Sequence, residues 1–351
     1  MQQDLFAAAN TRRGFYSLFD ETIEACAGKI FLIKGGPGTG KSTFMKAVAD
    51  AADRKGYAVE RIHCSSDTAS LDGVSIPQKG MLILDATAPH CVDPKLPGIR
   101  EHLLAFGEFW DADLLAPHAQ EIEALSRSIS DHFTLVYRYL AAAGEIRQAA
   151  ETVLRRAFDA EKAERTAARL LRRLAVLPEG KPGKRTKKIV SALTKDGVLQ
   201  YDETLRAAHT VVVEDSYDGA ALFMDVVDRA LSRLGADRVV FADPLDPDRI
   251  DHILLPGRGI AFVSKNYRLP TKADGAEKTI RLRSFLDPAI LAAHKNKLAF
   301  SKKTCLALYD GIFSLLAREK ELHDKLETRY IEAMDFDRLT AFTKDFIQKE
   351  I

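Results

Sequence analysis

The sequence predicts an α/β protein built from two tandem, similar halves, each with a mainly parallel sheet followed by a helical hairpin. An apolar segment at 29–34 runs into a glycine-rich loop, and a helical pattern then continues to about Lys55. Two more short apolar segments, at 57–63 and 81–85, are separated by polar loops. This alternation is typical of strands connected by crossover helices. A similar pattern returns in the second half of the chain.

The second half repeats the first at a shift of 179 residues, which aligns Ile30–Thr87 with His209–Asn266 without a gap. Identical residues at matched positions include Gly40/Gly219, Phe44/Phe223, Gly56/Gly235, Asp72/Asp251 and Gly80/Gly259. Self-similarity over such a length predicts a tandem duplication. We therefore expect both halves to adopt the same fold.

Hydrophobic spacing divides each half further. Apolar residues at intervals of three and four predict an amphipathic helix at 14–27 and long helices after Phe109. Residues 64–72 form a polar loop. The predicted divisions are 1–190 for the first half (α/β part about 11–115, helical hairpin about 116–177, basic linker 178–190) and 191–351 for the second (α/β part about 191–285, helices about 286–351).

Length and composition indicate a globular chain. Its 351 residues suffice for about two domains, and 46% hydrophobic and 29% charged residues are ordinary for such proteins. The N-terminus lacks a basic region followed by an apolar core, and no apolar run is long enough to span a membrane. Four cysteines without a C-x-x-C pair fit a reducing compartment. We expect a cytoplasmic protein with no membrane partner.

Basic residues are concentrated between 147 and 190, where thirteen Lys and Arg face five Asp and Glu. Such a block can contact nucleic acid or another polyanion. No aromatic residues interleave with the charges in the manner of a nucleic-acid surface. The pattern favours a solvated helix face followed by a charged linker.

The segment Gly35-Gly-Pro-Gly-Thr-Gly-Lys-Ser-Thr43 has the form G-x-x-x-x-G-K-[ST]. Glycines let the backbone close around phosphate oxygens with its N–H groups pointing inward, and the following helix directs its positive end at the same anion. This pattern predicts a phosphate-binding P-loop. The predicted nucleotide-binding residues are Gly35, Gly36, Pro37, Gly38, Thr39, Gly40, Lys41, Ser42 and Thr43.

Catalytic and metal-binding roles follow from the same motif. Lys41 supplies a positive charge for the β- and γ-phosphates, and the Ser42 hydroxyl is the expected Mg²⁺ ligand. Asp85 ends an apolar strand about forty residues later, where P-loop proteins place a second group for Mg²⁺. Ala86 follows, where many ATPases carry a glutamate that activates water. The water-activating base must therefore come from elsewhere, or hydrolysis is slow.

Polar residues after the predicted strands are candidates for this base. Asp67 and Asp72 recur as Asp246 and Asp251 in the second half, which favours a role in bracing loops. His90 is replaced by Leu269 and so correlates better with the intact motif. Our hypothesis is that His90 or Asp67 positions the attacking group.

The second half lacks the chemistry of the first. Ala220, Ala221 and Ser264 stand where the first half has Lys41, Ser42 and Asp85. Glu214 and Asp215 would also repel phosphate. We expect a nucleotide-free scaffold, from which Lys265 or Arg268 could approach the nucleotide in the manner of an arginine finger.

Four motifs taken together resemble a bacterial family of ATPases with two consecutive P-loop-type halves: Gly35–Thr43, His63–Asp67, Leu71–Gly73 and Leu84–His90. The resemblance covers nearly the whole chain and implies ATP as the nucleotide and a cytoplasmic location. The leading hypothesis is a Mg²⁺-dependent ATPase. The alternatives are a kinase that phosphorylates a small molecule or nucleotide, and a non-hydrolysing module that binds a partner under nucleotide control.

Overall fold

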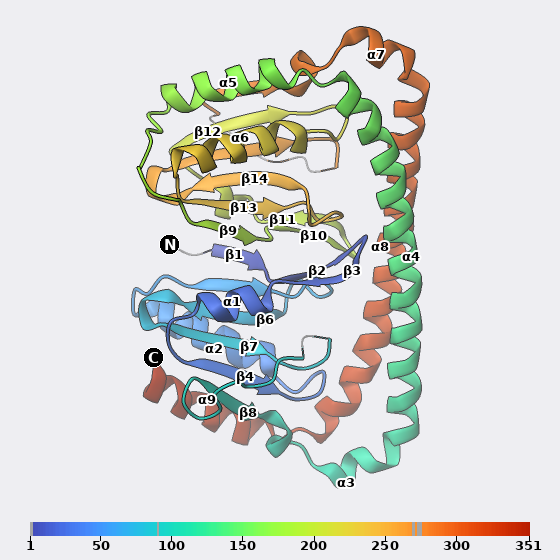
Figure 1. Ribbon diagram of the computed structural model, residues 1–351. Coiled ribbons are helices and arrows are strands. Elements are labelled where there is room, and N and C mark those ends of the chain that lie inside the picture. Colours follow the sequence, from blue (N-terminus) through green and yellow to red (C-terminus); the bar gives the residue numbers. More distant parts are fainter. Residues whose placement is uncertain (1–2, 90, 269–270, 272–275) are drawn as a thin grey trace.

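The computed structural model describes residues 3–89, 91–268, 271 and 276–351 (Figure 1). Two α/β units, each built on a six-stranded sheet, lie one above the other, and two long helices run along one side of both. Among the described residues, no helix combines the length and apolar character needed to cross a membrane.

The sheet of the first unit has the order β1-β5-β6-β7-β4-β8. Its strands are β1 (Gln3–Phe6), β4 (Ile30–Lys34), β5 (Glu60–His63), β6 (Leu71–Ile76), β7 (Met81–Asp85) and β8 (Glu101–Ala105). Strand β6 is antiparallel to both of its neighbours, and the other pairs are parallel. The sheet is therefore mixed, with mostly parallel pairing, because β6 returns directly from β5 without a crossover helix.

Strand β4 shows why both faces of this sheet are covered. Ile30 and Leu32 pack on one side against helix α1 (Phe19–Ala25), whereas Phe31 and Ile33 pack on the other against α2 (Lys41–Arg54). Alternate side chains of a strand point to opposite faces, so a strand covered on both sides is apolar throughout. This explains the unbroken apolar run that precedes the glycine-rich loop.

Two local predictions for the first unit were wrong. Helix α1 covers only the later part of the predicted 14–27, because Gly14–Ser17 forms β3, paired with β2 (Ala8–Thr11). The polar loop predicted at 64–72 ends earlier, because Leu71 already begins β6. In both cases pairing with a neighbouring strand overrides the local pattern.

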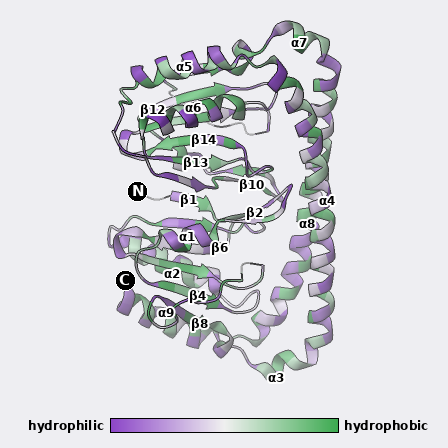
Figure 2. Cartoon of the chain, viewed as in Figure 1, coloured by the Kyte–Doolittle hydropathy of each residue, from purple (hydrophilic) through white to green (hydrophobic). Residues whose placement is uncertain are grey.

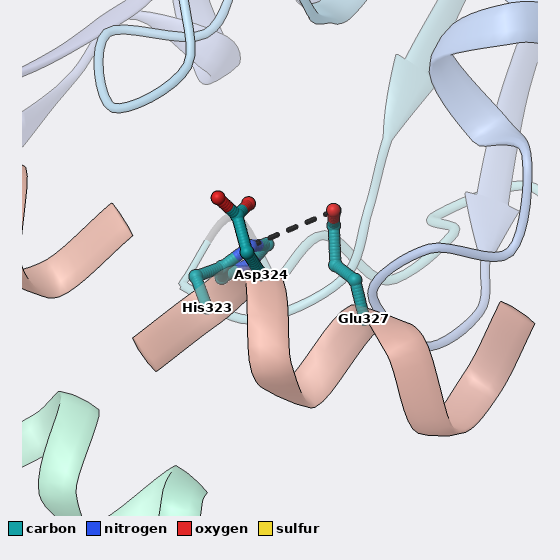
Figure 3. Close-up of side chains that lie close together, drawn as sticks. All are labelled: His323, Asp324 and Glu327. Carbon is teal, nitrogen blue, oxygen red and sulfur yellow. Dashed lines mark ion pairs between the residues drawn. The ribbon is translucent and has the colours of Figure 1, made fainter. Parts of the chain in front are cut away.

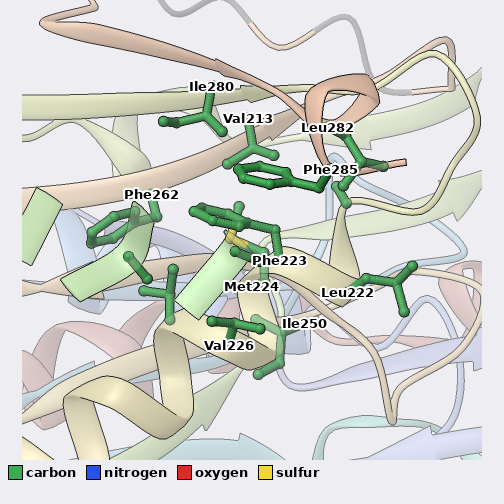
Figure 4. Packing of buried hydrophobic residues seen from close by; sticks show 14 of the residues in the cluster. Val213, Leu222, Phe223, Met224, Val226, Ile250, Phe262, Ile280, Leu282 and Phe285 are labelled. Carbon is green, nitrogen blue, oxygen red and sulfur yellow. The ribbon is translucent and has the colours of Figure 1, made fainter. Parts of the chain in front are cut away.

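The second unit repeats these pairings in the order β16-β12-β15-β14-β13-β9. Its strands are β9 (Arg185–Lys188), β12 (His209–Glu214), β13 (Arg238–Ala242), β14 (Ile250–Leu255), β15 (Ile260–Lys265) and β16 (Lys278–Arg281). A hairpin of β10 (Ser191–Thr194) and β11 (Gly197–Gln200) corresponds to β2 and β3. Helix α6 (Ala221–Leu234) packs its Phe223 on Phe285 with ring centroids 5.1 Å apart (Figure 4).

Helices α4 (Ala119–Ala157) and α8 (Lys295–Ala333) run antiparallel along both units, preceded by the short helices α3 (Ala112–Leu115) and α7 (Pro288–Ala293) (Figure 1). Each long helix has 39 residues, and a shared cluster that includes Leu140 and Ile312 joins them. The hairpin predicted at 116–177 is not formed, because the partner of α4 is a helix of the other half. Helical spacing reports a buried face but not its partner.

The last helix of each half completes the other half's unit. Helix α5 (Ala160–Arg173) packs on α6 of the second unit, and α9 (Phe336–Glu350) packs on α2 of the first. In Figure 2 the strands are mostly hydrophobic, whereas α5 and α9 alternate hydrophilic and hydrophobic segments. The predicted division into 1–190 and 191–351 therefore differs from the division into spatial units.

Candidate functional site

The glycine-rich loop connects β4 to α2 with a backbone that only glycine adopts readily. Gly38 and Gly40 have φ angles of 71° and 83°, in the left-handed region. Helix α2 begins at Lys41, and its N-cap Gly40 provides no side-chain cap. The first N–H groups of α2 are therefore not satisfied by a capping side chain, as an anion site at a helix N-terminus requires.

Lys41, at the start of α2, lies beside Asp85, at the end of β7. Strands β4 and β7 pair in parallel with Ile33 opposite Asp85, so the strand that ends in Asp85 is a neighbour of the strand before the glycine-rich loop. Lys41 Nζ lies 3.5 Å from Asp85 Oδ2 and donates to the carbonyl oxygens of Gly36 at 2.6 Å and Gly35 at 3.2 Å. Two residues that were predicted to act on the phosphates and on Mg²⁺ thus lie side by side next to the loop.

Hydroxyl groups hold the glycine-rich loop in place. Thr39 Oγ1 donates to the Gly36 carbonyl at 2.8 Å, and Thr87 Oγ1 donates to the Gly35 carbonyl at 3.0 Å. Ser42 Oγ accepts the N–H of Leu71 at 3.0 Å. The Ser42 hydroxyl and the Asp85 carboxylate are hard oxygen donors, so their chemistry fits Mg²⁺. Of the other predicted residues, Pro37 lies within the loop and Thr43 is exposed on α2.

Asp72 is a buried acid in electrostatic reach of this pair. Burial raises its pKa to about 7, the charge of Asp85 adds to the rise, and a hydrogen bond with Cys64 and the charge of Lys41 oppose it. The sequence indicated a loop brace here. The structure instead places Asp72 within β6, beside the predicted charge pair.

Asp67 braces its loop and also joins it to α8. Its carboxylate accepts from Ser70 Oγ at 2.9 Å and lies 3.5 Å from Lys320 Nζ. Burial raises the pKa of Asp67, but the Ser70 hydrogen bond and the Lys320 charge outweigh this, so the pKa is lowered. The other base candidate, His90, lies outside the described residues.

Helix α8 packs directly on the glycine-rich loop. We call Lys320, His323, Glu327 and Tyr330 the α8 face, because their spacing of three and four residues places them on one side of the helix. A Cβ atom at Gly36 would lie 2.6 Å from Tyr330 Cε1, and one at Gly38 would lie 2.8 Å from the Glu327 carbonyl oxygen. These glycines are therefore also required for the close approach of α8.

His323 and Glu327 face each other on this side of α8, with Nδ1 3.5 Å from Oε1 (Figure 3). The side chains of His323, Asp324 and Glu327 thus bring a ring nitrogen and two carboxylates within 4.8 Å of one another. Burial lowers the pKa of His323, and the positive charges of Lys320 and Lys41 lower it further against the carboxylates. Sequence reasoning missed the α8 face because its residues lie almost 300 positions from the loop and match no local motif.

At the corresponding place in the second unit, the loop after β12 is filled by its own acid. Asp215 accepts the N–H groups of Tyr217 at 2.8 Å and Ala220 at 2.7 Å, so its carboxylate occupies N–H groups that a phosphate would need. Burial raises the pKa of Asp215 to about 6, and the charge of Asp218 adds to the rise. Asp218 itself has a φ of 63°.

A buried ion network lies beside this loop. Arg268 Nη2 donates to Asp218 at 2.6 Å and to Asp243 at 3.0 Å, and its side chain is 1% exposed. Arg147 of α4 binds the same two acids, and cavities of about 340 and 290 Å³ flank it. The expectation that Arg268 approaches the nucleotide is wrong, because its guanidinium is bound within the second unit. Lys265 is exposed at the end of β15.

Comparison with protein-family models, with curated proteins and with solved structures finds no match for this chain. Its function must therefore be inferred from the site itself.

Proposed function

We propose that this protein is a P-loop nucleoside triphosphatase that binds and hydrolyses Mg·ATP in its first unit. The observation that carries the proposal is the 3.5 Å pair of Lys41 and Asp85 beside an uncapped helix N-terminus and a glycine loop. P-loop sites combine this lysine, this strand-end carboxylate and such a loop to bind the phosphates.

Each part of the site has a role in this proposal. The loop N–H groups bind phosphate oxygens, and Lys41 exchanges its bonds to the Gly35 and Gly36 carbonyls for bonds to the β- and γ-phosphates. Ser42 and Asp85 would hold Mg²⁺, which would neutralise phosphate charge. Positioning and charge stabilisation then supply most of the rate enhancement.

We also propose that the two units arose by tandem duplication and that the second is nucleotide-free. The identical order of strand pairings in the two sheets supports the first point. The second is supported by the Asp215 carboxylate in the loop and by the absence of a lysine at the place of Lys41. In this proposal the second unit is a scaffold that carries α8 to the first.

The packing of α8 on the loop favours a second candidate, a module that binds a protein or small-molecule partner under nucleotide control without hydrolysis. Helix α8 contacts the loop at Gly36 and Gly38 and also runs along the second unit. Any change in the loop on nucleotide binding would therefore be felt in both units. Hydrolysis of ATP without a partner separates the first candidate from this one.

Phosphate release from Mg·ATP and equilibrium binding of Mg·ATP test the proposal. Lys41→Ala is expected to abolish both, whereas Lys46→Ala, an exposed lysine on the same helix, is expected to change neither. Release that needs Lys41 supports the triphosphatase. Binding that needs Lys41, without release, supports the module or, if an added acceptor becomes phosphorylated, a kinase. The absence of binding would contradict the central proposal.

A further inference from the structure

The proposed triphosphatase needs a group that positions the attacking water. In many ATPases a glutamate directly after the strand-end aspartate has this role, and this chain has no glutamate there. Ala86 follows Asp85, and Lys34, at the end of β4, donates to the Ala86 carbonyl and lies 3.5 Å from Asp93. Asp67 is bound to Ser70 and Lys320. The α8 face brings a further set of proton-accepting groups to the same place.

The position of His323 follows from contacts on either side of it along α8. One turn earlier, Lys320 reaches Asp67 in the loop after β5. One and two turns later, Glu327 and Tyr330 contact the glycine-rich loop after β4. Residues three and four apart share one side of a helix, so His323 faces the space between the two loops. Lys41 is close enough for its charge to act on His323, and Lys41 Nζ lies 3.5 Å from Asp85 Oδ2.

The second unit gives an independent check on how far this helix position reaches. Arg147 in α4 and His323 in α8 stand at the same place counted from the first residue of each 39-residue helix. Arg147 donates to Asp218, in the loop after β12, at 3.0 Å and to Asp243, directly after β13, at 2.6 Å. A side chain at this position therefore reaches between the two corresponding loops.

We infer that His323, oriented by Glu327, positions the attacking water and accepts its proton during hydrolysis of the ATP γ-phosphate. This inference rests on the proposed function. Glu327 Oε1 lies 3.5 Å from Nδ1. In this proposal Nδ1 carries the proton that faces Glu327, and Nε2 is the base. The water oxygen bonds to the γ-phosphorus as its bond to the ADP oxygen breaks. One water proton passes to Nε2, and ADP leaves with the electron pair on its β-phosphate, beside Lys41.

The charges around His323 keep the ring in the form that this role needs. On α8 it faces Lys320, Asp324 and Glu327, and from α2 it senses Lys41. Burial comes first among the causes that lower its pKa, and the result lies below the ordinary 6.5. The ring is therefore neutral at pH 7 and can accept a proton. Transfer of that proton to solvent then restores the base.

The test compares His323→Ala with His294→Ala, a histidine at the opposite end of the same helix. We expect His323→Ala to lower kcat about 100-fold, within the usual range for a lost general base, and to leave Mg·ATP affinity unchanged. Added imidazole should restore part of the lost rate in His323→Ala alone. Glu327→Gln should lower kcat by a smaller factor without any response to imidazole, because it removes only the orienting group.

The outcomes distinguish the inferred role of His323 from the proposed triphosphatase function. If wild type and His323→Ala release phosphate at the same rate, His323 has no catalytic role while the proposed function stands. A rate lost together with affinity, and not restored by imidazole, would show that His323 only supports the fold. Binding of Mg·ATP by the wild type without release would also overturn the inference. Failure of binding altogether would overturn the proposed function.

Discussion

Asp72 and Asp251 are buried carboxyl groups at matching places in β6 and β14, and burial raises both pKa values to about 7. A neighbouring carboxylate adds to the rise in each unit, Asp85 for Asp72 and Asp243 for Asp251. The fold therefore holds a proton on each group that an unfolded chain would release near pH 4. Both units are thus sensitive to pH at the same point of the sheet.

The first residue-scale prediction concerns Asp72→Asn, which mimics the protonated acid. Between pH 4 and 7 the folded wild type keeps a proton that the unfolded chain has lost, so its free energy of unfolding falls as pH rises. The loss is at most about 1.4 kcal/mol per pH unit and levels off above pH 7. Asp72→Asn has no carboxyl group to titrate at this position. Its free energy of unfolding relative to that of the wild type should therefore increase from pH 5 to 8.

Urea unfolding at a series of pH values measures this difference. Asp131→Asn, which alters an exposed carboxylate on α4, serves as the control. Its free energy of unfolding should differ from that of the wild type by the same amount at every pH. If the difference in free energy of unfolding between Asp72→Asn and the wild type were also independent of pH, Asp72 would be ionised in the folded protein at pH 5.

At the scale of secondary structure elements, the exchange of α5 and α9 ties the two units together. Phe346 of α9 packs edge-on against Phe44 of α2, with ring centroids 5.0 Å apart. Leu171 of α5 belongs to the core of the second unit. Each half therefore buries an apolar helix face in the unit of the other, and neither sheet is fully covered by its own half.

This exchange predicts that two matched variants each destabilise the unit formed mainly by the other half of the chain. Phe346→Ala should cost about 3–5 kcal/mol and Leu171→Ala about 2–5 kcal/mol, because both create buried cavities. Hydrogen exchange should show lower protection of β4 and β7 in Phe346→Ala, and of β12 and β15 in Leu171→Ala. If Phe346→Ala instead loosened the second unit first, the exchange of helices would not control local stability.

At the scale of the whole molecule, α4 and α8 connect the site of one unit to the structure of the other. Arg147 belongs to the first half of the chain, yet it binds Asp218 and Asp243 in the second unit. Burial and Arg268 lower the pKa of Arg147, but the two carboxylates outweigh them and raise it. The charge is thus retained deep inside the protein by its partners.

Removing that charge should leave buried carboxylates without a partner. We predict that Arg147→Ala lowers the free energy of unfolding by about 3–5 kcal/mol. Arg155→Ala, two turns further along α4 with a side chain 59% exposed, should change it by about 1 kcal/mol or less. Denaturant unfolding of both variants measures the difference. Equal, small effects would mean that water or the neighbouring arginines replace Arg147.

Much of the fold was predictable because its signals are local. The apolar run of β4 and the glycines at positions that need left-handed backbone reflect neighbouring residues alone. The same holds for the residues that distinguish the second loop from the first, of which Asp215 is the clearest. The sequence by itself thus determined the α/β class, the two-unit architecture and the position of the glycine-rich loop.

Only the tertiary structure decided which parts meet. A buried helix face shows that a partner exists, and α4 could equally have folded back on its own half, as we expected. The antiparallel return of β6, the exchange of α5 and α9, and the packing of α8 on the glycine-rich loop all depend on long-range packing. Such contacts are set by the shapes of surfaces distant in sequence, and no local pattern records them.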